Sequence, residues 1–164
     1  MSFEGSSLWR VRQKVGNDLL LWPGATVLVE DADGRILLGL RRDNGVWAMP
    51  GGGAEEGGSF AATALAELHE EVGLEADARD LIAFACVSQP ADHLVSYPNG
   101  DMTHYFGIWF ALRRWRGEPV ADGDELLELG WFPRGAPPEA LMHSSAVALD
   151  HYARFLETGV FQIG

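Results

Sequence analysis

The fold is decided by the stretch Met49–Leu74, which reads MPGGGAEEGGSFAATALAELHEEVGL. A proline and a run of glycines open the stretch, and Phe60–Val72 is rich in residues that favour a helix. Ser59 is suited to accept a hydrogen bond at the helix N-terminus, and Gly73 is suited to end the helix in a left-handed conformation. The sequence therefore predicts a glycine-rich loop that leads directly into a helix.

The predicted helix has two chemically different sides. At about 100° per residue its apolar side chains form one stripe that should face the core. Glu67, Glu70 and Glu71 are expected to point away from this stripe, with Glu67 and Glu71 one turn apart. The apolar stripe consists of Ala61, Leu65, Leu68 and Val72.

No Lys or Arg lies in Phe60–Val72 to offset the charge of the three glutamates. An ordinary solvated acidic face would explain the pattern by itself. However, the glycine-rich loop ahead of the helix lets the backbone approach a ligand closely. Carboxylates and backbone carbonyls together form an all-oxygen donor set, which suits Mg²⁺ or Mn²⁺ rather than zinc. We therefore expect a site for a hard divalent cation.

Composition limits the class of protein. The 164 residues are 47% hydrophobic, as expected for one α/β domain with a single core. The formal net charge of -12 opposes binding of a long nucleic acid. No apolar run could span a membrane and no leader is recognisable, which predicts a cytoplasmic protein. Cys86, the only cysteine, lies in an apolar run and is expected to be buried and inert.

Patterning along the chain predicts three helices and a mixed sheet. Residues 1–20 are expected to form an extension with a short helix that could cap the domain or support a homodimer, and residues 21–164 to form a single domain. The segment Gln89–Thr103 is expected to be a polar loop. The predicted helices are Ser7–Val15, Phe60–Val72 and Glu139–Glu157, and the predicted strands are Ala25–Glu30, Arg35–Leu40, Leu81–Ser88, His104–Trp115 and Glu125–Phe132.

The spacing of the glycines and glutamates resembles the Nudix box. That pattern is Gly, five residues, Glu, seven residues, then Arg-Glu-apolar-x-Glu-Glu-x-Gly-apolar, and here it begins at Gly52 and closes with Glu67–Leu74. Gly58 and Ala66 replace the Glu and the Arg of the pattern, which in the family look like a pair that braces the loop against the helix. Because both are lost together, no charge is stranded, and we expect a rewired brace rather than an inactive site.

The resemblance implies a fold and a metal site. The fold would be a Nudix-type α/β/α sandwich with a mixed β-sheet. Glu67 and Glu71 would be ligands of Mg²⁺ or Mn²⁺, Glu70 a further ligand or the group that orients water, and the Gly51 carbonyl a ligand from the loop. The candidate for the general base is Glu125, although an ordinary loop carboxylate would be equally consistent with its position.

The resemblance also implies a substrate class, a nucleoside diphosphate linked to another moiety. Gly52 would approach it through its backbone. Arg41 and Arg42 could reach its phosphates, although solvated charges at a strand end would look the same. Trp47 and Tyr97 could stack on a base, although core or lid packing is the more usual role of such residues.

Other function classes differ in how well they fit the sequence. The first is a catalytically weak or silent Nudix-like module that binds a nucleotide, which Gly58 and Ala66 would favour. The second is an unrelated acidic domain with a merely solvated helix. A P-loop or a serine hydrolase is disfavoured, because the glycine-rich loop has no lysine and the Gly-x-Ser-x-Gly motif is absent.

Overall fold

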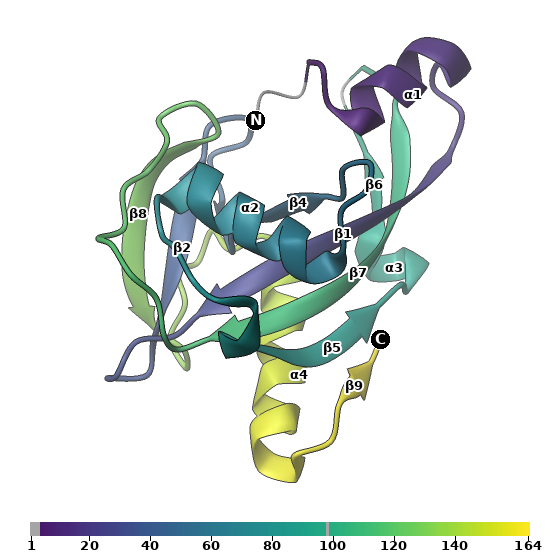
Figure 1. Ribbon diagram of the computed structural model, residues 1–164. Coiled ribbons are helices and arrows are strands. Elements are labelled where there is room, and N and C mark those ends of the chain that lie inside the picture. The colour runs from purple at the N-terminus through teal and green to yellow at the C-terminus, as the bar shows by residue number, and fades with distance from the viewer. Residues whose placement is uncertain (1–3, 98) are drawn as a thin grey trace.

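The computed structural model describes residues 4–97 and 99–164, and its strands lie between helices (Figure 1). The helices are α1 (Ser7–Val15), α2 (Phe60–Val72), α3 (Pro90–His93) and α4 (His143–Thr158). The strands are β1 (Leu20–Val29), β2 (Arg35–Arg41), β3 (Trp47–Ala48), β4 (Gly51–Gly53), β5 (Leu81–Val87), β6 (Leu94–Ser96), β7 (Met102–Leu112), β8 (Leu126–Pro133) and β9 (Gln162–Ile163).

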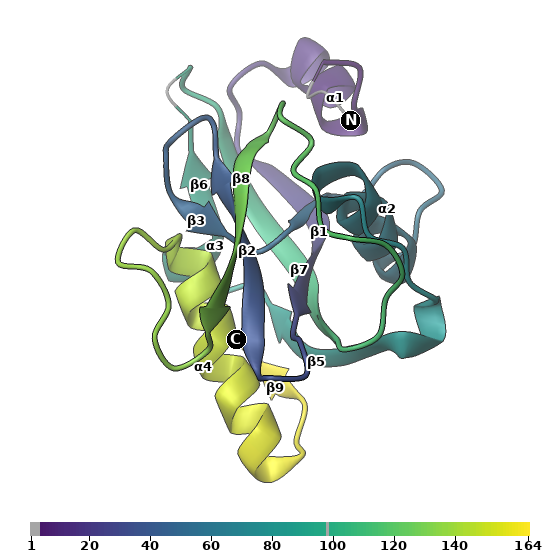
Figure 2. The same cartoon turned by 90° about the vertical axis from the view of Figure 1, so that its left-hand side faces the viewer.

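The strands form two sheets. The larger has the order β4-β1-β7-β5-β9, with β6 paired to β7, and the smaller has the order β3-β2-β8. Strand β1 runs parallel to β7 and antiparallel to β4, so the larger sheet is mixed. Helices α2 and α4 lie on opposite sides of the sheets (Figure 2). The predicted α/β/α sandwich with a mixed sheet is confirmed.

Each of these two helices covers its own apolar cluster. On the side of α2, Leu68 packs with Val27 and Phe110. On the side of α4, Tyr152 packs against Phe84, with 5.0 Å between the ring centroids. Alternate residues of β1 and β7 supply the two clusters, which is why these central strands are almost continuously apolar.

The last helix begins at His143 and not at Glu139 as predicted. The segment before it is extended and pairs with the edge of β3. The Trp47 N–H donates to the Ala140 carbonyl at 2.8 Å, and the Met142 N–H donates to the Trp47 carbonyl at 2.8 Å. These backbone groups therefore bond across the sheet instead of forming a first helical turn.

Two further predictions were wrong in this half of the chain. The predicted loop 89–103 contains α3 and β6, and β6 pairs with the start of β7 through Val95 and Thr103. Cys86 is a free thiol that is only half-buried, because its neighbours on β5, Ala85 and Val87, take the core-facing positions. Within the described ranges, no helix is long and apolar enough to cross a membrane.

Candidate metal and substrate site

Helix α2 has the bounds that the sequence predicts, and both expected caps are present. The Ser59 hydroxyl accepts a hydrogen bond from the Ala62 N–H at 3.2 Å. Gly73 adopts a left-handed conformation with φ of 69°, and its N–H donates to the His69 carbonyl. These caps fix where the acidic side chains begin and end along the helix.

The core-facing side of α2 is rotated from the predicted one. Ala64, Leu68 and Val72 are completely buried, whereas Ala61 and Leu65 are only half-buried. The buried side is therefore centred on Ala64, Leu68 and Val72 rather than on the predicted stripe.

Glu71 lies on this buried side, which corrects the prediction that all three glutamates point away from the core. Only 4% of Glu71 is exposed. Its carboxylate accepts a hydrogen bond from the Gly51 N–H of β4 at 2.9 Å, which offsets part of the cost of burying it. Gly51, predicted to contribute its carbonyl, thus contacts the acidic cluster through its N–H.

Glu67 lies against the glycine-rich loop. A Cβ at position 52 would lie 2.3 Å from Oε1 of Glu67, so a larger residue there would displace the Glu67 carboxylate from its present position. Gly52 therefore lies beside the acidic side of α2. The candidate site combines the backbone of the glycine-rich loop with the carboxylates of the helix.

The electrostatics of the cluster follow from burial and mutual repulsion. Burial, reinforced by Glu67, raises the pKa of Glu71 to about 8. Burial, reinforced by Glu70 and then Glu125, raises the pKa of Glu67 to about 7. Burial also raises the pKa of Glu125. The charges of these groups are under-compensated, which is the condition that a bound cation relieves.

The donor chemistry fits a hard divalent cation. In residues 4–97 and 99–164 no three His, Cys, Asp or Glu side chains are close enough to hold an ion as they stand. Yet Glu67, Glu70 and Glu71 share one turn of α2, two of them have raised pKa values, and Gly52 leaves space where a Cβ would otherwise lie. An all-oxygen set of this kind suits Mg²⁺ or Mn²⁺.

The two arginines expected at phosphates already have protein partners. Arg41 donates two hydrogen bonds of 2.9 Å to the Asp43 carboxylate, and it is near enough to Glu71 and Glu125 for their charges to raise its pKa, although burial opposes this. Arg42 donates to the Asp124 carbonyl at 2.9 Å. Arg41 therefore lies beside the acidic cluster, and Arg42 is turned towards the loop that precedes β8.

The two aromatic candidates differ in their surroundings. Trp47 packs edge-on against Phe132, with 4.8 Å between ring centroids, in the cluster on the side of α4. Tyr97 is exposed, and its hydroxyl lies 2.9 Å from that of Tyr105. Tyr105 was not singled out from the sequence, and its only signal there is its place in an apolar strand. Arg41 is near enough to influence its pKa.

Comparison with known proteins decides the family. The NUDIX domain model matches residues 20–152, which is most of the chain. The chain belongs to the Nudix family. The predicted family membership is thus confirmed, and the Nudix box of the chain runs from Gly52 in β4 through α2 to Leu74.

Individual relatives agree with this assignment. A protein named RNA pyrophosphohydrolase from Roseobacter denitrificans is 40% identical over 63 residues, which are 37% of this chain and 39% of the relative. A protein of the same name from Sphingopyxis alaskensis is also 40% identical over 63 residues, 37% of this chain and 40% of the relative. The chain thus spans about two fifths of the length of these relatives. The crystal structure of a MutT NUDIX hydrolase from Burkholderia pseudomallei has a TM-score of 0.68 at 25% identity, and the match covers 80% of this chain and 97% of that one.

Gly52→Ala tests the wall of the site formed by the loop. The added methyl group would displace the end of the flexible Glu67 side chain, so the melting temperature should change by only a few degrees at most. Mn²⁺ affinity, measured by electron paramagnetic resonance, should fall by about 10-fold because a displaced carboxylate no longer aims at the ion. The matched control is Gly135→Ala, where a Cβ would meet open space. Equal Mn²⁺ affinity in the two variants would contradict the placement of Glu67.

Proposed function

We propose that the chain is a metal-dependent hydrolase that cleaves the diphosphate link of a nucleoside diphosphate joined to another moiety. The observation that carries the proposal is the pairing of Glu67 with the buried Glu71 on one turn of α2, against a loop whose Gly52 leaves room for the Glu67 carboxylate. The single hydrogen bond from Gly51 offsets only part of the cost of burying Glu71, and a bound cation would offset the rest. Membership of the Nudix family supports the same conclusion.

Each acidic residue has a proposed role. Glu67 and Glu71 would hold Mg²⁺ or Mn²⁺, with Glu70 as a further ligand or the group that orients the attacking water. When bound, the ion would neutralise the diphosphate and lower the pKa of water. Glu125 would take the proton of the water as its oxygen attacks one phosphorus and the bridging P–O bond breaks. Burial raises its pKa, which makes it a stronger base than an ordinary carboxylate.

The substrate contacts are proposed from position. Arg41 would face the phosphates, because it lies beside the acidic cluster. Its hydrogen bond to the Asp43 carboxylate orients its guanidinium and favours the charged form. Tyr97 would border the nucleoside, with Tyr105 fixing its hydroxyl. Gly52 would approach the diphosphate through its backbone. Arg42 and Trp47 are weaker candidates, since each is already engaged with other parts of the protein.

Two other candidates rest on specific observations. Gly58 and Ala66 favour a weak or silent module that binds a nucleotide without cutting it. The relatives named RNA pyrophosphohydrolase favour an RNA substrate. The net charge of -12 argues against a long RNA, because phosphates would be repelled wherever no cation intervenes.

A substrate panel separates these candidates. In Mg²⁺ we expect turnover of compounds in which a nucleoside diphosphate is joined to another moiety. Each cleavage should give two monophosphate products that mass spectrometry identifies, and a chelator should abolish turnover. Binding of a nucleotide without turnover of any substrate would support the silent module instead. Faster cleavage of a triphosphate-bearing RNA than of every small molecule would favour the RNA candidate.

A further inference from the structure

The loop of the Nudix box is held by a helix that lies outside the matched family domain. The carboxylate of Glu55 lies at the N-terminus of α1, where the Ser7 N–H donates to its two oxygens at 2.9 and 3.0 Å. The Ser7 hydroxyl donates to the same carboxylate at 2.6 Å. Only 5% of Ser7 is exposed. A carboxylate is well placed at a helix N-terminus, because the backbone N–H groups there have no partner within the helix.

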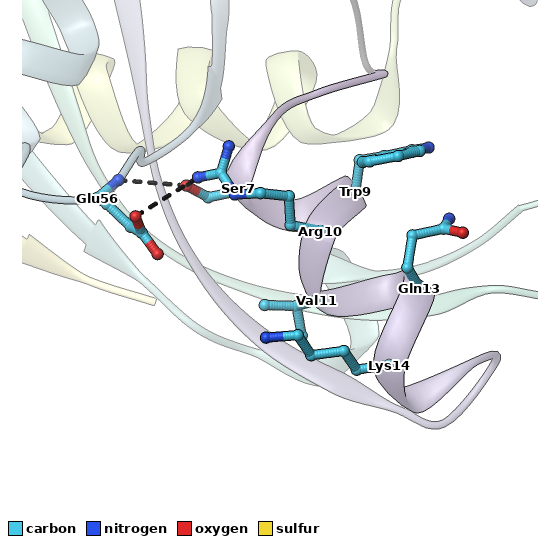
Figure 3. A pocket seen from close by; sticks show the side chains of 7 residues that line it. All are labelled: Ser7, Trp9, Arg10, Val11, Gln13, Lys14 and Glu56. Atoms are coloured by element: carbon cyan, nitrogen blue, oxygen red, sulfur yellow. Dashed lines mark hydrogen bonds and ion pairs between the residues drawn. The ribbon is translucent and has the colours of Figure 1, made fainter.

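A second residue of α1 adds charge to this contact. Arg10 lies 3.8 Å from the Glu55 carboxylate and 3.6 Å from that of Glu56. The Glu56 N–H donates to the Ser7 hydroxyl at 3.3 Å. Figure 3 shows Ser7 and Arg10 turned towards Glu56, whereas Trp9 and Gln13 point away from it. One end of α1 therefore grips two successive residues of the loop.

The gripped loop, residues 54–59, connects the two walls of the candidate site. At one end it continues from β4, whose Gly51 donates to Glu71. At the other end Ser59 caps α2, which carries the glutamates. The turn within the loop is closed by the Gly58 N–H, which donates to the Glu55 carbonyl at 2.9 Å. A shift of the loop would therefore change how the glycines face the carboxylates.

Helix α1 is itself anchored to the sheet. Arg12, with 6% of its surface exposed, donates to the Asp18 carbonyl at 2.6 Å and to the Thr103 hydroxyl at 2.9 Å. It also donates to the Met102 carbonyl and lies 3.7 Å from the Asp101 carboxylate. The start of β7 thus fixes α1, and α1 in turn can fix the loop.

The contact with α1 involves the same loop as one of the two positions that depart from the box. The two positions that depart from the box, Gly58 and Ala66, lie in the same loop and on α2. A Cβ at position 58 would lie 3.0 Å from the Glu55 carbonyl, so a side chain at position 58 needs the turn to move by only a few tenths of an ångström. The family match begins at residue 20, after α1 has ended.

We propose that Ser7 and Arg10 of α1 are positioning residues that hold the 54–59 loop through Glu55, in place of the Glu–Arg pair that the box has lost. The inference rests on the proposed function for its catalytic meaning, but not for its structural test. Glu55 orients the loop and the loop orients Glu67 and Glu71. Helix α1 then forms a working part of the site rather than a passive extension.

Ser7→Pro and Glu55→Gln test the contact from its two sides. Ser7 is the first residue of α1 after the cap, where proline is favoured, so Ser7→Pro removes both donors while leaving the helix intact. Glu55→Gln removes the charge of a partly exposed side chain, and we expect the protein to remain folded without that charge. The matched control is Gln13→Ala, an exposed residue on the side of α1 away from Glu56.

The readouts do not depend on turnover. In both variants the amides of residues 54–59 should exchange with deuterium at least about 10-fold faster in metal-free protein. Mn²⁺ affinity should fall by about 10-fold, as for other residues that orient metal ligands. Gln13→Ala should match the wild type in both measurements. Unchanged exchange and affinity in Ser7→Pro and Glu55→Gln would overturn the proposal.

Restoring the family pair provides the decisive rescue. Gly58→Glu together with Ala66→Arg should return Mn²⁺ affinity to within about 3-fold of the wild type in the Glu55→Gln background. Ala66→Arg alone should not, because its guanidinium would lack the carboxylate. Failure of the pair to rescue would show that α1 does not replace it. A wild type without turnover on any substrate would reject the proposed function, while the exchange measurement would still decide the role of α1.

Discussion

Replacing Glu71 by glutamine should lower turnover by more than about 100-fold while leaving the protein folded. Loss of a residue that merely orients a metal ligand costs about 10–100-fold in affinity or activity, so loss of a ligand itself should cost more. Glutamine has the same shape and can still accept the hydrogen bond that the Gly51 N–H donates at 2.9 Å. Any fall in turnover therefore reports the missing charge rather than a collapsed site.

Two quantities are measured, the turnover of the best substrate of the panel and the affinity of the protein for Mn²⁺. The matched control is Glu157→Gln. Glu157 is an exposed carboxylate in the last turn of α4, outside the acidic cluster. The control should behave as the wild type. Near-normal turnover in Glu71→Gln would remove Glu71 from the metal site, and the roles of Glu67 and Glu70 would need to be reassigned with it.

The sequence predicted best where local chemistry decides the structure. Helix α2 begins and ends at the predicted residues because Ser59 and Gly73 satisfy its ends without help from the rest of the chain. The box spacing led to the family, which the match over residues 20–152 confirms. The assignment of roles to individual site residues remains a prediction.

The sequence failed where a distant segment supplies the partner. The start of α4 is displaced because residues 140–142 bond to Trp47, almost a hundred positions earlier. Glu55 was passed over because its partner Ser7 is 48 positions away, and no local pattern links them. Glu71 was wrongly predicted to face solvent, because the apolar stripe does not reveal that the Gly51 N–H of β4 donates to its carboxylate on the buried side. Long-range hydrogen bonds of this kind have no period in the sequence.

A second large effect is expected on stability in metal-free solution. The pKa of Glu71 rises from 4.5 to about 8 on folding, so between these values the folded protein keeps a proton that the unfolded chain releases. Unfolding free energy should therefore fall as pH rises from about 4.5 to 8. Each pKa unit is worth about 1.4 kcal/mol, so at pH 8 Glu71→Gln should be more stable than the wild type by on the order of a few kcal/mol.

Comparing the wild type with Glu71→Gln isolates this carboxyl group from the histidines. Burial lowers the pKa of His93 and His151, which gives a stability gain as pH rises, but both proteins carry these residues. Thermal melts at pH 5 and pH 8 should show a gap that opens with pH in chelator. Adding Mg²⁺ should then narrow the gap at pH 8, because a ligand stabilises by roughly 2.7 kcal/mol at 100 times its Kd and only the wild type binds the ion well. If the difference in stability between the two proteins did not change with pH, the pKa of Glu71 would be the same in the folded and unfolded states. Glu71 would then be ionised in the folded apo protein, and cation binding would release no proton from it.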